Sequence, residues 1–185
     1  MRTFIALETP EPIRKKIHQL QARLAEANAE VRWESIDKLH ATVKFLGDVD
    51  ERNMPEVLSR IESTSKAYRT FDLRLHQLGC FPNQYQPRII WLGCLNTNGV
   101  LDLLKISLDN ELSTLGFEIE ARAFHPHITL GRVKGQQHIY HLTSMMEKLT
   151  FEPQHFEVDE VVVVKSELKP GGSEYSPLLR VRLQG

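Results

Sequence analysis

The sequence predicts an α+β protein in which two pseudo-symmetric lobes of antiparallel sheet face a central groove and helices lie on the outside. Strand-like and helix-like stretches alternate along the 185 residues, and a strand containing His-x-Thr occurs twice. Each copy precedes a helix and then two strands joined by a turn. No low-complexity or linker-like stretch separates the copies, so we expect residues 1–185 to form a single bilobal domain.

The first part of the chain predicts strand, helix, strand and helix in that order. Residues 2–8 (RTFIALE) are rich in strand-forming side chains. Apolar residues then recur every three or four positions, which predicts a helix with one buried face that ends near Asn28. These residues are Ile13, Ile17, Leu20 and Leu24. A strand at 39–47 ends at a glycine, and the apolar spacing within 50–64 predicts a second helix.

The middle of the chain predicts two strands followed by a long helix. Apolar and polar side chains alternate at the start of 71–81, as in a half-buried strand, and 88–95 predicts a more buried one. The interval 83–87 is their turn. A helix closed by Gly116 is expected next, because five leucines share one stripe. They are Leu101, Leu104, Leu108, Leu112 and Leu115.

The last part of the chain repeats the alternation. One or two strands are expected within 117–134 and a helix within 136–149. Residues 155–168 predict a strand, 169–174 (KPGGSE) a turn and 175–183 a final strand.

Composition excludes several classes of protein. With 41% hydrophobic residues, 25% charged residues and a net charge of −1, the chain is an ordinary globular sequence rather than one that coats nucleic acid by bulk charge. Cys80 and Cys94 form no CxxC pair, so neither a disulfide framework nor a thiolate zinc site is indicated, and a reducing cytoplasmic location is expected. No apolar run approaches the roughly 18 residues of a membrane span.

The His-x-Thr stretches, LHATV at 39–43 and PHITL at 126–130, are the strongest functional signal. Successive side chains of a strand point to opposite faces, so His40 and Thr42 share one face, and His127 and Thr129 share one face of their own strand. The apolar residues between them would pack under helices. If a pseudo-twofold axis relates the lobes, both histidines and both threonines converge on the groove.

This set of side chains suits a phosphate ester. Histidine gives and takes protons near neutral pH, so a pair can divide the roles of general acid and general base. Threonine hydroxyls can donate hydrogen bonds to phosphate oxygens on which negative charge builds. A 2′,3′-cyclic phosphate is a natural substrate for the pair, and the reaction needs no metal ion or other cofactor.

Three alternatives compete with this interpretation. A single histidine in a strand is more often packed or solvated than catalytic, but two copies at corresponding places in a duplicated pattern favour a site. His125 and His127 could begin a metal site, yet no third ligand with recognisable spacing accompanies them. A noncatalytic nucleotide- or RNA-binding module is the third alternative, and the presence of both histidines argues against it.

The motifs resemble those of the 2H phosphoesterases, and most closely their branch of RNA 2′,3′-cyclic phosphodiesterases, also called 2′-5′ RNA ligases. The resemblance covers nearly the whole chain and rests on RTFIALE, LHATVKFLG, RIIWLG, FHPHITLGRV, VVVVKSEL and YSPL. It implies that His40 donates a proton to the leaving ribose oxygen and that His127 accepts one from water. On physical grounds alone the pseudo-symmetry makes these roles interchangeable. The resemblance also implies that Thr42 and Thr129 contact the phosphate.

Two further residues, Phe45 and Arg132, are implied by the resemblance as a nucleobase-stacking platform and a supporting cation. Strict alternation places Phe45 on the face opposite His40, so stacking requires the strand to end, bend or bulge near the glycine that follows. Without that, Phe45 is a core residue. Arg132 falls on the core face by the same parity and is otherwise a solvated charge, whereas Lys44 has the better parity for the groove.

Paired motifs and resemblance together predict a metal-independent phosphodiesterase. Its expected substrates are RNA ends or nucleotides that carry a 2′,3′-cyclic phosphate, and the resemblance implies a 2′-phosphate product. The reverse reaction, 2′-5′ RNA end joining, would use the same residues and is the second enzymatic interpretation. Neither a membrane nor an obligate protein partner is indicated.

Overall fold

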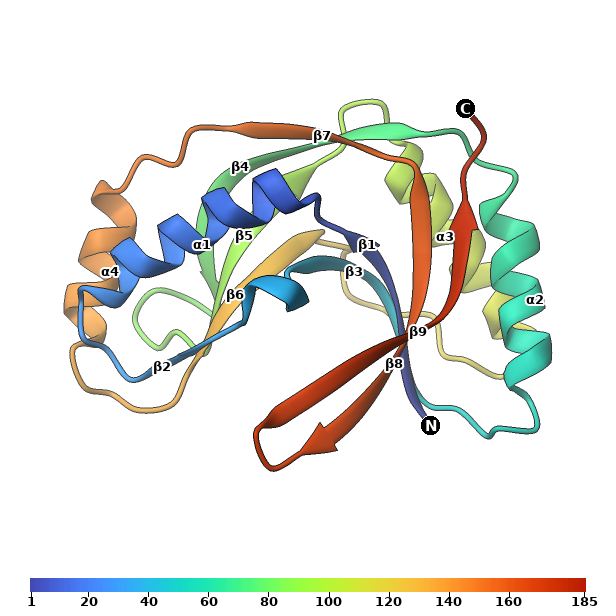
Figure 1. The fold of residues 1–185 in the computed structure, drawn as a ribbon, viewed down its shortest axis with the longest axis horizontal. Helices are drawn as coiled ribbons and strands as arrows, with labels where there is room; N and C mark the ends of the chain where they lie inside the picture. The colour runs from blue at the N-terminus through green and yellow to red at the C-terminus, as the bar shows by residue number, and fades with distance from the viewer.

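Nine strands form one curled sheet in the computed structural model, which describes residues 1–185 (Figure 1). The strands are β1 (Arg2–Glu8), β2 (Val31–Trp33), β3 (His40–Asp48), β4 (Phe71–Phe81), β5 (Ile89–Leu95), β6 (His127–Val133), β7 (Gln154–Val158), β8 (Glu160–Lys169) and β9 (Gly172–Arg182). The helices are α1 (Glu11–Ala25), α2 (Met54–Ser65), α3 (Val100–Ser113) and α4 (Ile139–Lys148), with a short 3-10 helix η1 (Ile36–Lys38). The predicted α+β class is confirmed.

The sheet consists of two lobes that meet at the strands carrying His-x-Thr. One lobe has the order β3-β1-β8-β9 and the other β6-β5-β4-β7, and β2 adds to β6. All the pairings between these strands are antiparallel. The lobes are joined by β3 and β6, whose ladder has one pair of Cα partners, Ala41 and Ile128.

Helices pair across the halves of the sequence. Helix α1 packs against α4 at one end of the molecule, and α2 packs against α3 at the other (Figure 1). Their apolar stripes are buried as predicted: the α1 stripe and all but the last leucine of the α3 stripe are among the core residues. Burial of each such side chain stabilises the fold by about 1.5–3 kcal/mol. None of the helices is long and apolar enough to cross a membrane.

The central strands are buried on both faces. In β1, Ile5 and Leu7 belong to the large core shared with the helices. Phe4 and Ala6 point to the opposite face, where they form a small apolar cluster with two valines of β8, Val162 and Val164. We call this opposite face, on which the helices do not pack, the groove face.

Of the one or two strands expected within 117–134, the structure has one, β6. It differs from the sequence prediction in two places. Strand β2 and helix η1 are short elements that the apolar pattern did not reveal. The strand expected at 155–168 is two strands divided at Asp159. The division has a topological cause, because β7 pairs with β4 in one lobe whereas β8 pairs with β1 in the other.

Candidate active site

The two His-x-Thr strands lie side by side at the centre of the sheet. Ala41 and Ile128, each the residue that follows a motif histidine, are direct partners. Continuing this antiparallel register by one residue sets His40 across from Thr129 and Thr42 across from His127. All four side chains are half-buried, while the apolar residues between and after them are buried in the core. The structure therefore brings the four predicted motif residues together on the groove face.

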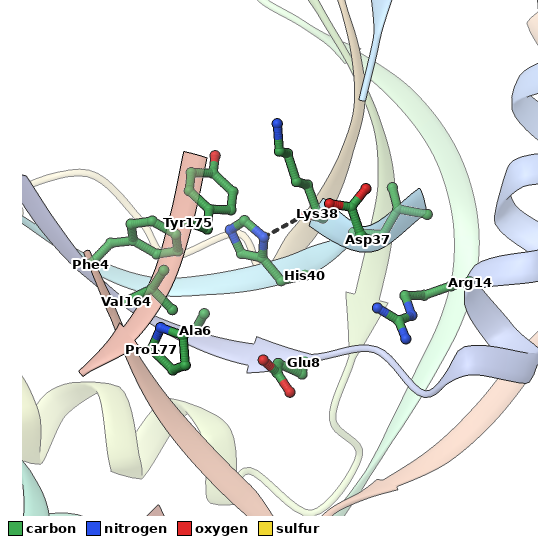
Figure 2. A pocket seen from close by; sticks show the side chains of 11 residues that line it. Phe4, Ala6, Glu8, Arg14, Asp37, Lys38, His40, Val164, Tyr175 and Pro177 are labelled. Atoms are coloured by element: carbon green, nitrogen blue, oxygen red, sulfur yellow. Dashed lines mark hydrogen bonds between the residues drawn. The ribbon is translucent and has the colours of Figure 1, made fainter. Parts of the chain in front are cut away.

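Aromatic rings flank each imidazole. The His40 ring stacks on Phe4, with centroids 4.9 Å apart and planes at 23°, and Tyr175 meets it edge-on at 5.6 Å (Figure 2). His127 has Phe81 edge-on at 5.2 Å and Trp91 at 6.2 Å.

A pocket adjoins each histidine. One of about 150 Å³ is lined by His40 with Phe4 and Tyr175, and a larger one of about 300 Å³ by His127 with Phe81 and Trp91. Each histidine is thus held between aromatic rings at the wall of a pocket, which leaves space for a ligand on both sides of the pair.

Backbone carbonyls determine which ring nitrogen of each histidine can react. The Nδ1 of His40 lies 2.6 Å from the carbonyl oxygen of Lys38, and the Nδ1 of His127 lies 2.6 Å from that of His125. A carbonyl oxygen only accepts hydrogen bonds, so each Nδ1 carries the proton and donates it. Nε2 is left to take or give a proton, and in His40 this atom is 3.2 Å from the Thr42 hydroxyl.

Burial lowers the pKa of both motif histidines. It lowers the pKa of His40 below the usual range, with a smaller contribution from the charge of His127, although the bond to the Lys38 carbonyl opposes the shift. Burial also lowers the pKa of His127, although the bond to the His125 carbonyl opposes the shift, and the positive charge of Arg132 adds to it. Neutral imidazoles are therefore favoured at pH 7, and a protonated one is a strengthened acid.

A bulge brings Phe45 to the groove. Val43 and Lys44 together face Ile5 of β1, because Ile5 pairs with Lys44 and the next β1 residue pairs with Thr42. Both bulge residues are buried, so the parity reverses and Phe45 emerges with 67% of its surface exposed. Its ring lies 6.0 Å from that of Phe4. The geometric condition for a stacking platform at Phe45 is met.

The second motif strand has a matching bulge. Ile90 of β5 pairs with Gly131 and the next β5 residue pairs with Thr129, which leaves Leu130 as the extra residue. Parity reverses again, and Arg132 emerges on the groove side with its Nε 3.5 Å from a carboxylate oxygen of Glu34. Phe45 and Arg132 thus hold equivalent positions, five residues after their histidines.

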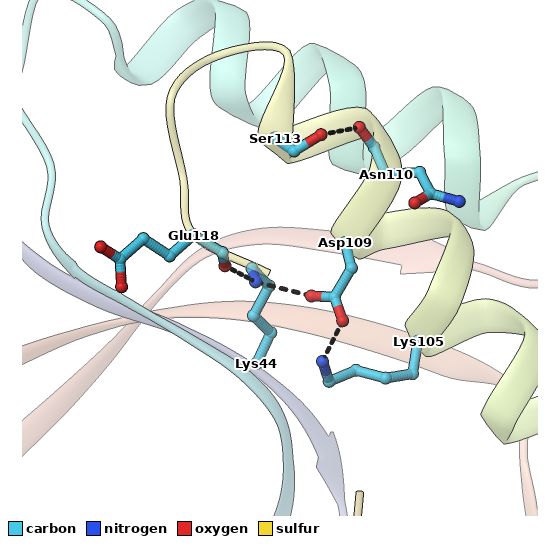
Figure 3. A network of polar contacts seen from close by, with 6 residues as sticks. All are labelled: Lys44, Lys105, Asp109, Asn110, Ser113 and Glu118. Carbon is cyan, nitrogen blue, oxygen red and sulfur yellow. Dashed lines mark hydrogen bonds and ion pairs between the residues drawn. The ribbon is translucent and has the colours of Figure 1, made fainter. Parts of the chain in front are cut away.

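The prediction that Lys44 has the better access to the groove is wrong. Its Nζ lies 2.6 Å from Oδ1 of Asp109 and 2.8 Å from the carbonyl oxygen of Glu118, on the helix-covered side of the sheet (Figure 3). Lys105 donates to the other oxygen of the same carboxylate. The bulge is the reason, since it turns Lys44 inward and its neighbour outward.

Sequence reasoning did not single out the aromatic residues beside the histidines. Phe4, Trp91 and Tyr175 all fall within segments on which the resemblance rests, and Phe81 comes at the end of a predicted strand. An aromatic side chain on the strand face that points away from the core would have indicated such a residue. Phe4 and Trp91 gave no such signal, because both faces of their strands are apolar and the sequence does not show which face is the core. No group of three or more His, Cys, Asp or Glu side chains is arranged to hold a metal ion.

Comparison with known proteins gives matches along the whole chain. A family model described as LigT-like phosphoesterase matches residues 7–91 and 96–175. An RNA 2′,3′-cyclic phosphodiesterase of Methanothermobacter thermautotrophicus is 34% identical over 184 residues, covering 99% of each chain. One of Thermotoga maritima is 32% identical over 185 residues, covering 100% of this chain and 97% of its own.

Solved structures agree with these matches. The protein TT0787 of Thermus thermophilus aligns with a TM-score of 0.84 and 26% identity, covering 100% of this chain and 99% of that one. Escherichia coli LigT complexed with 3′-AMP aligns with a TM-score of 0.79 and 27% identity, covering 100% and 98%. The matched segments include both motif strands with the bulges that they contain.

Proposed function

The chain belongs to the LigT-like phosphoesterase family, and from this membership and the site geometry we propose that it is an RNA 2′,3′-cyclic phosphodiesterase. Its substrates are RNA ends or nucleotides with a 2′,3′-cyclic phosphate, and its product is the 2′-phosphomonoester. The observation that supports the proposal is the register of the motif strands, which sets each histidine across from the threonine of the other motif, so that two imidazoles of fixed tautomer lie diagonally across one antiparallel ladder.

General acid–base chemistry follows from that arrangement. Nε2 of His127 takes a proton from water as the water oxygen attacks phosphorus in line with the departing ribose 3′ oxygen. The P–O3′ bond breaks, and His40 gives its Nε2 proton to O3′, so the phosphate remains on O2′. The two imidazoles end with exchanged protonation and return to the starting state through solvent. Geometry permits either direction, and the resemblance of the motifs is the basis for assigning His40 as the acid.

The surrounding residues have roles suited to a pentavalent phosphorane-like state. Thr42 and Thr129 donate hydrogen bonds to its non-bridging oxygens, where the negative charge increases. Arg132 adds a positive charge on the groove face, and Phe45 offers an exposed ring on which the terminal nucleobase stacks. These side chains supply the acid, the base and the charge stabilisation, so the mechanism uses no metal ion.

A hydrolysis assay tests the proposal. The purified protein is incubated in excess chelator with cytidine 2′,3′-cyclic phosphate and with an oligonucleotide that ends in the same group, and the product is identified. We expect turnover to a 2′-phosphate on both substrates. Absence of turnover in chelator refutes the metal-independent mechanism, and a 3′-phosphate product refutes the direction of P–O cleavage.

RNA end joining is the second candidate, and the size of the pocket beside His127 favours it. At about 300 Å³, with Phe81 and Trp91 in its wall, this pocket is larger than a single water molecule requires. A 5′-hydroxyl placed there would attack phosphorus in place of water and give a 2′-5′ linkage. Measuring hydrolysis and joining across a range of RNA concentrations separates the two reactions, and hydrolysis is expected to dominate because water is abundant.

A further inference from the structure

The bulge in β3 determines which of two adjacent side chains enters the groove. In a regular strand, Lys44 would lie beside Thr42 on the groove face and Phe45 would point into the core. The bulge reverses both positions, because two residues of β3 face the single residue Ile5. The aromatic ring reaches the groove only as long as Lys44 stays on the helix-covered side.

A buried ion cluster holds Lys44 on that side. The side chain of Lys44 is 4% exposed and that of Asp109, on α3, is 9% exposed. Lys44 also donates to the carbonyl oxygen of Glu118, in the segment between α3 and β6 (Figure 3). A buried ammonium is tolerated only when it is paired and hydrogen-bonded, so these contacts fix where the Lys44 side chain can go.

The second bulge shows that a bulge of this kind forms without a lysine. Gly131 stands in β6 at the position that Lys44 holds in β3, four residues after the histidine. A Cβ at Gly131 would lie 2.7 Å from Val31 and 2.9 Å from Trp33, so β2 approaches too closely for any side chain. Side chains of β2 that pack closely on the glycine accompany one bulge, and a buried ion pair accompanies the other.

Lys105 provides a comparison within the same cluster. It is as buried as Lys44 and donates to the same carboxylate, but it lies on α3 and faces the ring of Phe124, not the motif strand. Removal of Lys44 and removal of Lys105 have the same effect on the charges of the cluster, because each leaves Asp109 paired with one lysine. Only removal of Lys44 breaks the contact between Asp109 and the bulge in β3.

We propose that Lys44, held by Asp109, is a positioning residue that keeps Phe45 on the groove face and thereby sets the affinity for the nucleobase next to the cyclic phosphate. This inference rests on the proposed function for its kinetic consequence. Its structural part, the position of residue 45, is independent of any activity.

The kinetic test compares Lys44→Met with Lys105→Met and Phe45→Ala, and combines the first and last in a double variant. Cytidine 2′,3′-cyclic phosphate is compared with methyl riboside 2′,3′-cyclic phosphate, which has no base. We expect Lys44→Met and Phe45→Ala each to raise KM for the cytidine substrate by about 5- to 150-fold, the range for loss of one base–aromatic stack. The double variant should match Phe45→Ala alone, because both changes remove one contact.

Other outcomes overturn the proposal. Multiplying effects in the double variant, an unchanged KM in folded Lys44→Met, or an equal loss on the methyl riboside would each show that Lys44 does not act through Phe45. Lys105→Met should stay within about twofold of the parent protein, and a loss equal to that of Lys44→Met would assign the effect to the cluster as a whole.

A fluorescence measurement tests the structural part even if a variant folds poorly or the protein proves inactive on these substrates. Phe45→Trp places a reporter on the groove face, and acrylamide should quench it strongly. Lys44→Met or Lys44→Gln in that background should reduce the quenching. The signal of the chain's two own tryptophans is subtracted first, measured in the same lysine variant with Phe45 retained. Unchanged quenching in both lysine variants refutes the proposal, whereas lack of turnover by the parent protein refutes only the proposed function.

Discussion

Replacing Gly79 with alanine should disturb the pocket beside His127 from a distance. Gly79 in β4 lies under the indole of Trp91, and a Cβ there would fall 2.4 Å from two of its ring carbons and 2.9 Å from a third. Carbon atoms in contact prefer about 3.5–4.0 Å, so the ring must retreat by roughly 1–1.5 Å. Phe81 and His127 lie within 5.0 and 6.2 Å of the indole, measured between ring centroids.

The size of the effect follows from this displacement. Overpacking of this kind costs about 1–3 kcal/mol of folding free energy. For a chain of this length each kcal/mol lowers Tm by about 2–4 °C, which predicts a loss of about 2–12 °C. A group misplaced by about 1 Å at a reaction centre can cost about 10²-fold in rate, so kcat should fall by up to that factor.

Thermal unfolding and turnover of a cyclic-phosphate substrate measure the two effects. Gly171→Ala is the matched control, since a Cβ at this hairpin glycine meets nothing within 4 Å, and it should change neither quantity. Gly79→Ala should also have little further effect in a Trp91→Phe background, because the smaller ring leaves room. If Gly79→Ala melts and turns over like the parent protein, the packing argument is refuted.

Three further predictions concern charge and proton transfer. His40→Ala and His127→Ala should each lower kcat by about 10²–10⁴-fold without loss of fold, as checked by circular dichroism; unchanged turnover would assign the activity to other groups. Because the pKa values of both histidines are lowered, both limbs of the pH profile of kcat/KM should move to lower pH: the base must be neutral, above its pKa, and the acid protonated, below its own. The optimum should lie below about pH 6.5, and an optimum above about pH 7.5 contradicts the assignment. Asp109→Asn leaves two buried lysines without a counter-charge and should destabilise the protein by about 3–5 kcal/mol in urea unfolding, whereas a loss below about 1 kcal/mol would mean that the lysines reach solvent.

Local patterns were sufficient to predict the helices and the histidine pair. The stripes of α1 and α3 depend only on spacing within one helix, and the shared face of His40 and Thr42 depends only on strand alternation. The prediction that His40 and Thr42 meet the second motif depended on the duplicated order of elements. All of these are properties of short segments or of their sequence along the chain.

The faces of Phe45, Lys44 and Arg132 could not be predicted in the same way. Each depends on a bulge, and a bulge is set by contacts with another strand or helix: Asp109 for the first, and β2 for the second. The sequence neighbours of Lys44 contain no sign of Asp109, which lies 65 residues away. Nor does LHATVKFLG reveal that the strand changes parity in its middle.

Strand partners escaped prediction for a similar reason. The two halves were expected to form a lobe each, but the hairpin after the first motif joins the lobe of the second, and β8 and β9 join the lobe of the first. Alternation and turn residues identify strands, but they carry no information about which edge a hairpin will choose.

Each lobe combines strands from both halves of the chain, and this affects how the sheet forms during synthesis. Five of the eight strand pairings join residues before position 96 to residues after 126: β1 with β8, β2 with β6, β3 with β6, β4 with β7 and β5 with β6. As the polypeptide leaves the ribosome, β1, β3, β4 and β5 each wait with an unpaired edge, which is the form of a strand most prone to join a neighbouring molecule. The sheet is complete only after β8 and β9 have been synthesised, so β1, which contributes Phe4 to the pocket beside His40, keeps an open edge until then.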